Sequence, residues 1–240
     1  MHRLGCRPGV DRSAFRYAIG QLGTGSSSVW GAGGNLVEIR LLAVSAALGA
    51  ATFAVLEGVQ SVVREDHSFA APMSVYAVGA YGFVQTIAFV ALGLGSLALP
   101  AGLRQPVASP EWTLGRALLA TWALGVLLAA AFPIDSVPAV HGAASFVSFV
   151  AILAAMFVFA RACRSVARWR SFAAPSTWLA RSALAAFLVA VLTQPSFAFG
   201  VAQRVFLAAV VGWIIATALR LHAAKIGSAP AGTHHNRRAQ

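Results

Sequence analysis

Two side chains that could do chemistry lie six residues apart in the stretch FPIDSVPAVHG, residues 132–142. Asp135 supplies a carboxylate and His141 an imidazole, and a carboxylate that accepts a hydrogen bond from an imidazole N–H fixes the tautomer of the ring. The same pairing serves general-base catalysis, metal sites and proton relays. A hydrogen bond that only closes the turn accounts for the two residues equally well. The catalytic, ligand-binding and structural interpretations therefore stay open.

Other polar residues join this pair when the long apolar runs around them are treated as membrane helices. Ionisable groups within or beside such helices are energetically expensive and usually face the bundle interior or a wet cavity. The polar groups expected at the level of the pair are Glu57, Arg64, Glu65, Asp66, His67, Ser74, Tyr76, Gln194, Gln203 and Arg204. From this level we predict a ligand-binding pocket formed by Glu57, Ser74, Asp135, His141, Ser145, Gln203 and Arg204.

The charges of these residues indicate which of them pair within the predicted pocket. Arg204 is the natural counter-ion for Asp135 or Glu57, and it suits a lipid phosphate equally well. A metal site would use His67, His141 and a carboxylate such as Asp135. No motif demands a bound cofactor, and we predict none.

Helical spacing places His141, Ser145 and Ser148 on one face, because they are separated by four and three residues. Small and hydroxyl-bearing residues on a membrane helix let a neighbouring helix approach closely, and a serine can bond a carbonyl one turn back. For Ser145 and Ser148 the favoured interpretation is therefore helix packing, with ligand binding as the alternative.

Composition indicates the elements that must position these residues. The chain has 240 residues, of which 58% are hydrophobic and only 10% charged, and its mean hydropathy is +0.74. A soluble domain has about a quarter of its residues charged, so this chain has too little polar material to cover a surface in water. Lipid must cover it instead, which requires helices of roughly 20 apolar residues.

Six apolar runs of that length follow one another, most with Pro or Gly beside their ends. They cover residues 39–61, 75–99, 113–132, 140–160, 177–194 and 200–221. The predicted fold is all-α, an integral membrane bundle of six transmembrane helices over residues 38–224. The flanking segments 1–37 and 225–240 lack periodic apolar residues and are predicted to be disordered.

Basic residues predict the orientation of the bundle. With the N-terminus in the cytoplasm, only Arg64 and Arg204 among the 18 Lys and Arg residues lie outside, which is a strong positive-inside bias. Both termini are then cytoplasmic in a multi-pass protein of the bacterial inner membrane. Cys6 and Cys163 lie on the reducing side, so no disulfide is expected.

The net charge of +11 is explained by this topology and by contacts with anionic lipid, so we predict no nucleic-acid binding. Expected partners are membrane lipids, a second copy of the chain or another membrane protein. The sequence contains no phosphate-binding P-loop, dinucleotide fingerprint, HExxH or GxSxG motif. The apolar middle of each run argues against a channel or an ion-coupled transporter.

Three stretches together resemble a bacterial membrane family catalogued as domain of unknown function 998. They are PMSVYAVGAYGFVQTIAFVALGLGSLAL at residues 72–99, AAFPIDSVPAVHG at 130–142 and AQRVFLAAVVGW at 202–213. The matching features are Ser74 before an early helix, the turn from Phe132 to Asp135, His141 with Gly142, and Gln203 with Arg204. The resemblance covers about residues 38–224 and implies a compact polytopic fold without an assigned reaction.

Two functions of different class follow from the residues. The first is a non-enzymatic membrane protein that binds a lipid head group, a small ligand or a partner through the outer pocket, with Arg204 as the anion contact. The second is a membrane-embedded hydrolase or transferase acting on lipid, in which His141 is the base and Asp135 orients it, or in which a metal is held.

Overall fold

The computed structural model describes residues 31–64, 70–103, 109–194 and 196–223, with side chains described from Val37 onward. The chain divides into two compact units, Met1–Val37 and Glu38–Gln240, and the description below concerns the second. Most of the predicted disordered segments at 1–37 and 225–240 lies outside the described residues, although helix α2 already begins at Gly31.

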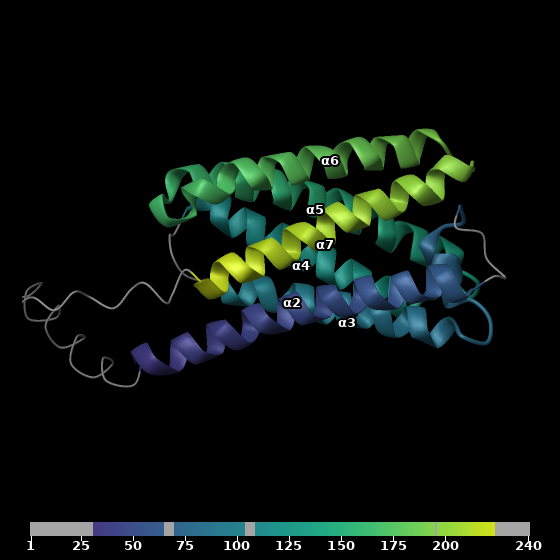
Figure 1. Cartoon of the computed structure of the whole chain (residues 1–240), viewed down its shortest axis with the longest axis horizontal. Helices are drawn as coiled ribbons and strands as arrows, with labels where there is room; N and C mark the ends of the chain where they lie inside the picture. Colours follow the sequence, from purple (N-terminus) through teal and green to yellow (C-terminus); the bar gives the residue numbers. More distant parts are fainter. Residues whose placement is uncertain (1–30, 65–69, 104–108, 195, 224–240) are drawn as a thin grey trace, which may run out of the picture. The chain divides into compact units, whose positions relative to one another are not determined.

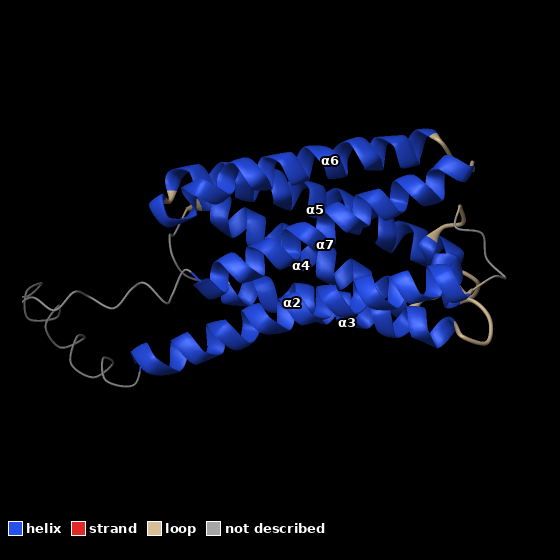
Figure 2. Ribbon diagram, viewed as in Figure 1, coloured by secondary structure: helices blue, strands red, loops and turns tan. Residues whose placement is uncertain are grey.

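The described residues contain six long helices and two short 3-10 helices, and no strand (Figure 2). The elements are α2 (Gly31–Val63), η1 (Met73–Ala77), α3 (Gly82–Gly102), α4 (Pro110–Ala131), α5 (Pro138–Ser165), η2 (Ala167–Phe172), α6 (Ala173–Leu192) and α7 (Phe197–Ala223). All six long helices are long and apolar enough to cross a membrane. The predicted all-α class and the six spans are confirmed.

Consecutive helices run in opposite directions and pack against each other (Figure 1). Helix α4 lies between α3 and α5, helix α6 lies between α5 and α7, and α7 also contacts α3 and η1. Helices α2 and α3 approach at Gly49 and Gly95, where a Cβ on Gly49 would collide with the carbonyl oxygen of Ala91. Backbones approach this closely only where both helices carry small residues, the usual device in lipid.

One predicted helix is wrong at its start. The run from Val75 contains a short 3-10 helix, an extended step at Val78 and the turn at Gly79, whose φ is +84°, before α3 begins at Gly82. The guanidinium of Arg64 donates to the carbonyl oxygens of Tyr76 and Val78, both at 3.0 Å. Because these carbonyls have a side-chain donor, the segment is stable without continuing as an α-helix.

Prolines account for most of the other boundary differences. Helices α4 and α5 begin at Pro110 and Pro138, earlier than predicted, because the first helical turn tolerates a residue without an N–H. Helix α3 passes through Pro100, which was predicted to end it, and continues to Gly102. Because Pro100 lies close to the helix end, its missing N–H removes only a single hydrogen bond.

One end of the bundle is filled by large aromatic side chains. Trp112 packs edge-on against Phe159 and Trp169, with ring centroids 5.2 and 5.6 Å apart, and Phe159 contacts Trp213 at 5.8 Å. All four side chains are almost fully buried. The indole N–H of Trp112 donates to the carbonyl of Leu103, and that of Trp213 donates to Ser176 Oγ. This end, which we call the basic end, is therefore a closed core in which both of these indole N–H groups have acceptors.

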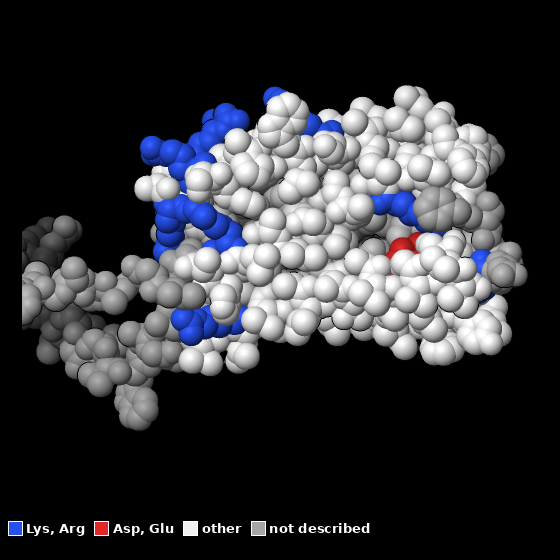
Figure 3. All heavy atoms as spheres, viewed as in Figure 1, with Lys and Arg blue, Asp and Glu red and all other residues white. Residues whose placement is uncertain are grey.

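Basic residues gather at that same end (Figure 3). Eight of the described arginines lie there, near the start of α2, α4 or α6, near the end of α5 or α7, or in η2. They are Arg40, Arg116, Arg161, Arg164, Arg168, Arg170, Arg181 and Arg220. Because neighbouring helices are antiparallel, these positions meet at one level. Arg64 and Arg204 lie at the opposite end, which we call the cavity end.

Candidate ligand-binding cavity

A cavity of about 730 Å³ lies at the cavity end, between helices α3 to α7 and the segment that leads into η1. Its volume is within the range of pockets that hold small molecules. The side chains around it are Ala70, Ala71, Pro72, Met73, Ser74, Phe89, Leu92, Trp122, Val126, Ala129, Ile134, His141, Gly142, Ser145, Phe146, Ser148, Phe149, Phe187, Ala190, Val191, Gln194, Ser196, Phe197, Phe199, Gln203, Phe206 and Leu207. Most of this surface is apolar, as in binding sites for hydrophobic ligands.

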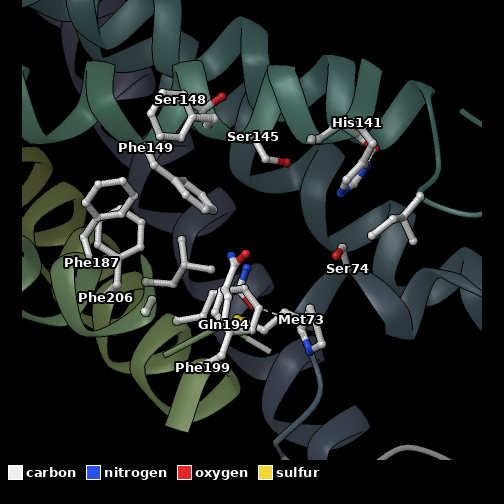
Figure 4. A pocket seen from close by; sticks show the side chains of 18 of the residues that line it. Met73, Ser74, His141, Ser145, Ser148, Phe149, Phe187, Gln194, Phe199 and Phe206 are labelled. Atoms are coloured by element: carbon white, nitrogen blue, oxygen red, sulfur yellow. Dashed lines mark hydrogen bonds between the residues drawn. The ribbon is translucent and has the colours of Figure 1, made fainter. Parts of the chain in front are cut away.

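Aromatic rings form the inner wall of the cavity. Phe149 stands edge-on to Phe206 at a centroid distance of 4.9 Å, and Phe187 lies 5.7 Å from Phe206. Trp122 contacts the far side of Phe149 at 6.3 Å, and its indole N–H is satisfied by Ser96 Oγ. These rings come from α4, α5, α6 and α7, so the wall exists only when the four helices are assembled (Figure 4).

His141 reaches into the cavity from the first turn of α5 and is only 3% exposed. Its Nδ1 lies 2.9 Å from the carbonyl oxygen of Phe132 and 3.1 Å from that of Ala129. In an uninterrupted helix, Ala129 O would accept from the N–H of residue 133, but that residue is Pro133, which has none. His141 supplies the missing donor, so it closes the end of α4 while its ring lines the cavity.

Ser74 and Ser145 lie near His141 at the polar end of the cavity (Figure 4). Ser74 belongs to η1 and Ser145 to α5. Ser148, one turn further along α5, donates to the carbonyl of Ala144 at 2.7 Å and packs against Gly125 of α4, where any Cβ would collide with its Oγ. The packing role predicted for Ser148 is confirmed, whereas Ser145 is half-buried beside the cavity.

Gln203 and Gln194 approach the cavity from α7 and from the turn after α6. Gln203 accepts a hydrogen bond from the backbone N–H of Met73 at 2.9 Å, which ties α7 to η1. Gln194 stands in the foreground of the cavity (Figure 4). Both side chains add amide groups to a wall that is otherwise mostly apolar.

Arg204 lies outside this wall, in a buried polar network next to it. Its guanidinium donates to the carbonyls of Ala71 and Gly200 and to the hydroxyl of Tyr76, at 3.0 to 3.1 Å. Arg204 Nη2 is also 3.6 Å from Glu57 Oε1. Of the two counter-ions considered for Arg204, the structure brings Glu57 to it. The predicted contact of Arg204 and Glu57 with a ligand stays a prediction.

The same network extends to two buried glutamines that sequence reasoning missed. Gln60 of α2 donates to Gln85 of α3, and both side chains are at least 96% buried. A lone glutamine inside an apolar run carries little signal by itself. The spacing of Glu57 and Gln60, three residues apart on one face of a membrane helix, is the signal that could have found the pair.

Asp135 lies in the turn between α4 and α5, exposed, and its carboxylate accepts from Ser136 at 3.3 Å. The donor nitrogen of His141 is directed at backbone carbonyls instead, so the structure does not bring Asp135 and His141 together as a hydrogen-bonded pair. Within the described residues, no three His, Cys, Asp or Glu side chains group as a metal site would require. His67, a metal candidate, lies outside the described residues, as do Glu65 and Asp66.

A scan against protein families matches residues 47–220 to the family described as protein of unknown function (DUF998). This match covers well over half of the chain and includes all three stretches that carried the resemblance. No curated protein and no solved structure matches the chain.

Proposed function

The chain belongs to the family of proteins of unknown function DUF998, and within that family we propose that it is a non-enzymatic membrane protein that binds a single lipid in the cavity described above. The apolar chain lies against Phe149, Phe187 and Phe206, and the head group meets His141, Ser74 and Ser145. The observation that carries this proposal is the combination of a 730 Å³ aromatic cavity with polar groups gathered at one of its ends.

Orientation enters the proposal through the charges. With the basic end in the cytoplasm, as the positive-inside bias predicts, the cavity lies in the outer half of the membrane. The ligand then comes from the outer leaflet or from the extracytoplasmic space. Replacing the exposed Asp135 by Cys tests this side: a membrane-impermeant maleimide should label Asp135→Cys in intact cells, and labelling only after lysis would reverse the assignment.

A lipid hydrolase or transferase gains no comparable support. In the enzyme predicted from the sequence, Asp135 accepts from the Nδ1–H of His141 and so orients the general base. That nitrogen is directed at the carbonyls of Phe132 and Ala129. We therefore propose binding and not catalysis.

A blocking substitution tests the binding of lipid. Ser145 points into the cavity (Figure 4), so Ser145→Phe fills the space that the ligand would occupy. The matched control is Val147→Phe, which adds a ring to the same helix at a position that is 52% exposed on its outer side. We expect lipid retained after purification and washing, measured by mass spectrometry, to fall roughly tenfold in Ser145→Phe, a difference of about 1.4 kcal/mol in binding free energy.

Val147→Phe should retain as much lipid as the unmodified protein. Substoichiometric lipid in the unmodified protein, together with no saturable binding of an added long-chain probe, would refute the proposal. Equal lipid in both variants would refute the assignment of the lipid to this cavity.

A further inference from the structure

The most buried titratable side chain at the polar end of the cavity is His141. In its neutral form it offers the cavity a hydrogen-bond acceptor and not a donor. His141 Nδ1 faces two carbonyl oxygens, at 2.9 and 3.1 Å, and carbonyl oxygens only accept. Nδ1 therefore carries a hydrogen. In the neutral ring with its proton on Nδ1, the other nitrogen, Nε2, has a lone pair and accepts hydrogen bonds.

The tautomer follows from the backbone and not from a ligand. Pro133 cannot donate to the carbonyl of Ala129, and His141 takes the place of that donor. Exchanging the proton to Nε2 would turn the Nδ1 lone pair toward two carbonyl oxygens and leave the end of α4 without its cap. The helix end thus fixes a hydrogen on Nδ1, and in the neutral ring Nε2 is then the acceptor.

Gln203 of α7 adds a complementary donor to the cavity lining. Gln203 Oε1 is engaged by the backbone N–H of Met73, so the group that Gln203 has left to offer is its amide NH2, with two donors. The hydroxyl groups of Ser74 and Ser145 both donate and accept, and they adapt to either partner. Every described residue of the cavity wall other than His141 has a side chain without a titratable charge.

We infer that the lipid bound in this cavity has an uncharged hydroxyl head group, as in a long-chain alcohol, a prenol or an acylglycerol. A hydroxyl donates to His141 Nε2 and keeps its lone pairs for the donors that Ser74, Ser145 and Gln203 add to the cavity lining. A phosphate or carboxylate oxygen only accepts and would meet the Nε2 lone pair. A quaternary ammonium has no N–H to donate. This inference rests on the proposed function and specifies the ligand class.

Three probes of one chain length test the head group on the full-length protein in lipid nanodiscs. They are hexadecanol, its methyl ether, which lacks the hydroxyl hydrogen, and hexadecyl phosphate, each competing against radiolabelled hexadecanol. We expect hexadecanol to bind about tenfold more tightly than the methyl ether, because the ether cannot donate a hydrogen bond to His141 Nε2. Hexadecyl phosphate should bind more weakly than hexadecanol.

The substitution His141→Phe should abolish the difference between the alcohol and the ether while the ether still binds. Because this variant also removes the cap of α4, the ranking of the three probes on the unmodified protein decides the question if the variant does not fold. Equal binding of alcohol and ether, or tightest binding of the phosphate, overturns the hydroxyl assignment but leaves lipid binding in place. Failure of all three probes to bind overturns the proposed function itself.

Discussion

The two ends of the helix bundle solve the same packing problem in opposite ways. At the basic end, Trp112, Phe159, Trp169 and Trp213 interlock. At the cavity end, Phe149, Phe187 and Phe206 line an open space. Both ends are built around aromatic side chains, and the difference lies in how the rings are arranged. An end that is filled holds the helices together, and an end that is lined but not filled offers room for a ligand.

The two ends also differ in how their polar side chains are hydrogen-bonded. The indole N–H groups of Trp112 and Trp213 at the basic end each have a partner within the protein. At the cavity end, His141 and Gln203 each bond to the backbone with one atom and also line the cavity. Side chains that bond to the backbone and also line a cavity are held in place while they remain accessible to a ligand.

The largest expected effect comes from opening the filled end. Trp213 is fully buried, and Trp213→Ala removes an indole that neighbouring helices cannot replace. We expect a loss of about 4 kcal/mol in the free energy of unfolding, measured by thermal unfolding in detergent. Trp213→Phe is the matched control and should lose about 1 kcal/mol, mainly because Ser176 Oγ loses its partner. Equal losses in both variants would mean that the hydrogen bond, and not the packing, holds this end.

The next effect comes from the buried ion pair beside the cavity. Arg204→Met leaves Glu57 buried without its counter-ion and removes the guanidinium that donates to the carbonyl of Ala71, so stability should fall by about 3 kcal/mol. Glu57→Gln keeps the bonds of Arg204 to Ala71, Gly200 and Tyr76, and we expect it to lose only about 1 kcal/mol. A chemical denaturation series in detergent would measure both. If Glu57→Gln were the more harmful variant, the pair itself would dominate the network.

A smaller effect is expected from truncating the wall of the cavity. Phe187 is half-buried and already borders empty space, so Phe187→Ala enlarges an existing cavity and should lose only about 1–2 kcal/mol. The same unfolding assay measures it against Trp213→Ala. A loss as large as that of Trp213→Ala would show that the cavity end is packed as tightly as the basic end, which would break the comparison.

The smallest effect concerns the residue that the sequence made most conspicuous. Asp135 is exposed and, within the described residues, its side chain bonds only to Ser136, so Asp135→Asn should change stability by less than about 0.5 kcal/mol. Binding of hexadecanol should also be unchanged. A loss of binding in Asp135→Asn, measured in the competition assay, would return Asp135 to the site.

The prolines show why element boundaries were harder to predict than elements. Pro100, Pro110 and Pro138 mark the neighbourhood of helix ends, but whether a proline stands just inside or just outside depends on which carbonyls find other donors. At residues 73–82 the start of the helix depends on Arg64, which is distant in the sequence and donates to two carbonyl oxygens. No local pattern contains that information.

The sequence by itself determined the class and the number of spans, because apolar runs of membrane length and the distribution of arginine are local or additive properties. It also selected Ser74, His141, Ser145 and Gln203, which do border the cavity, since polar groups in a membrane protein are few. Only the tertiary structure decided that Arg204 turns to Glu57 and that His141 turns to the carbonyls exposed by Pro133. Hydrogen-bond partners depend on the relative placement of several helices, and that placement becomes fixed only when the helices pack.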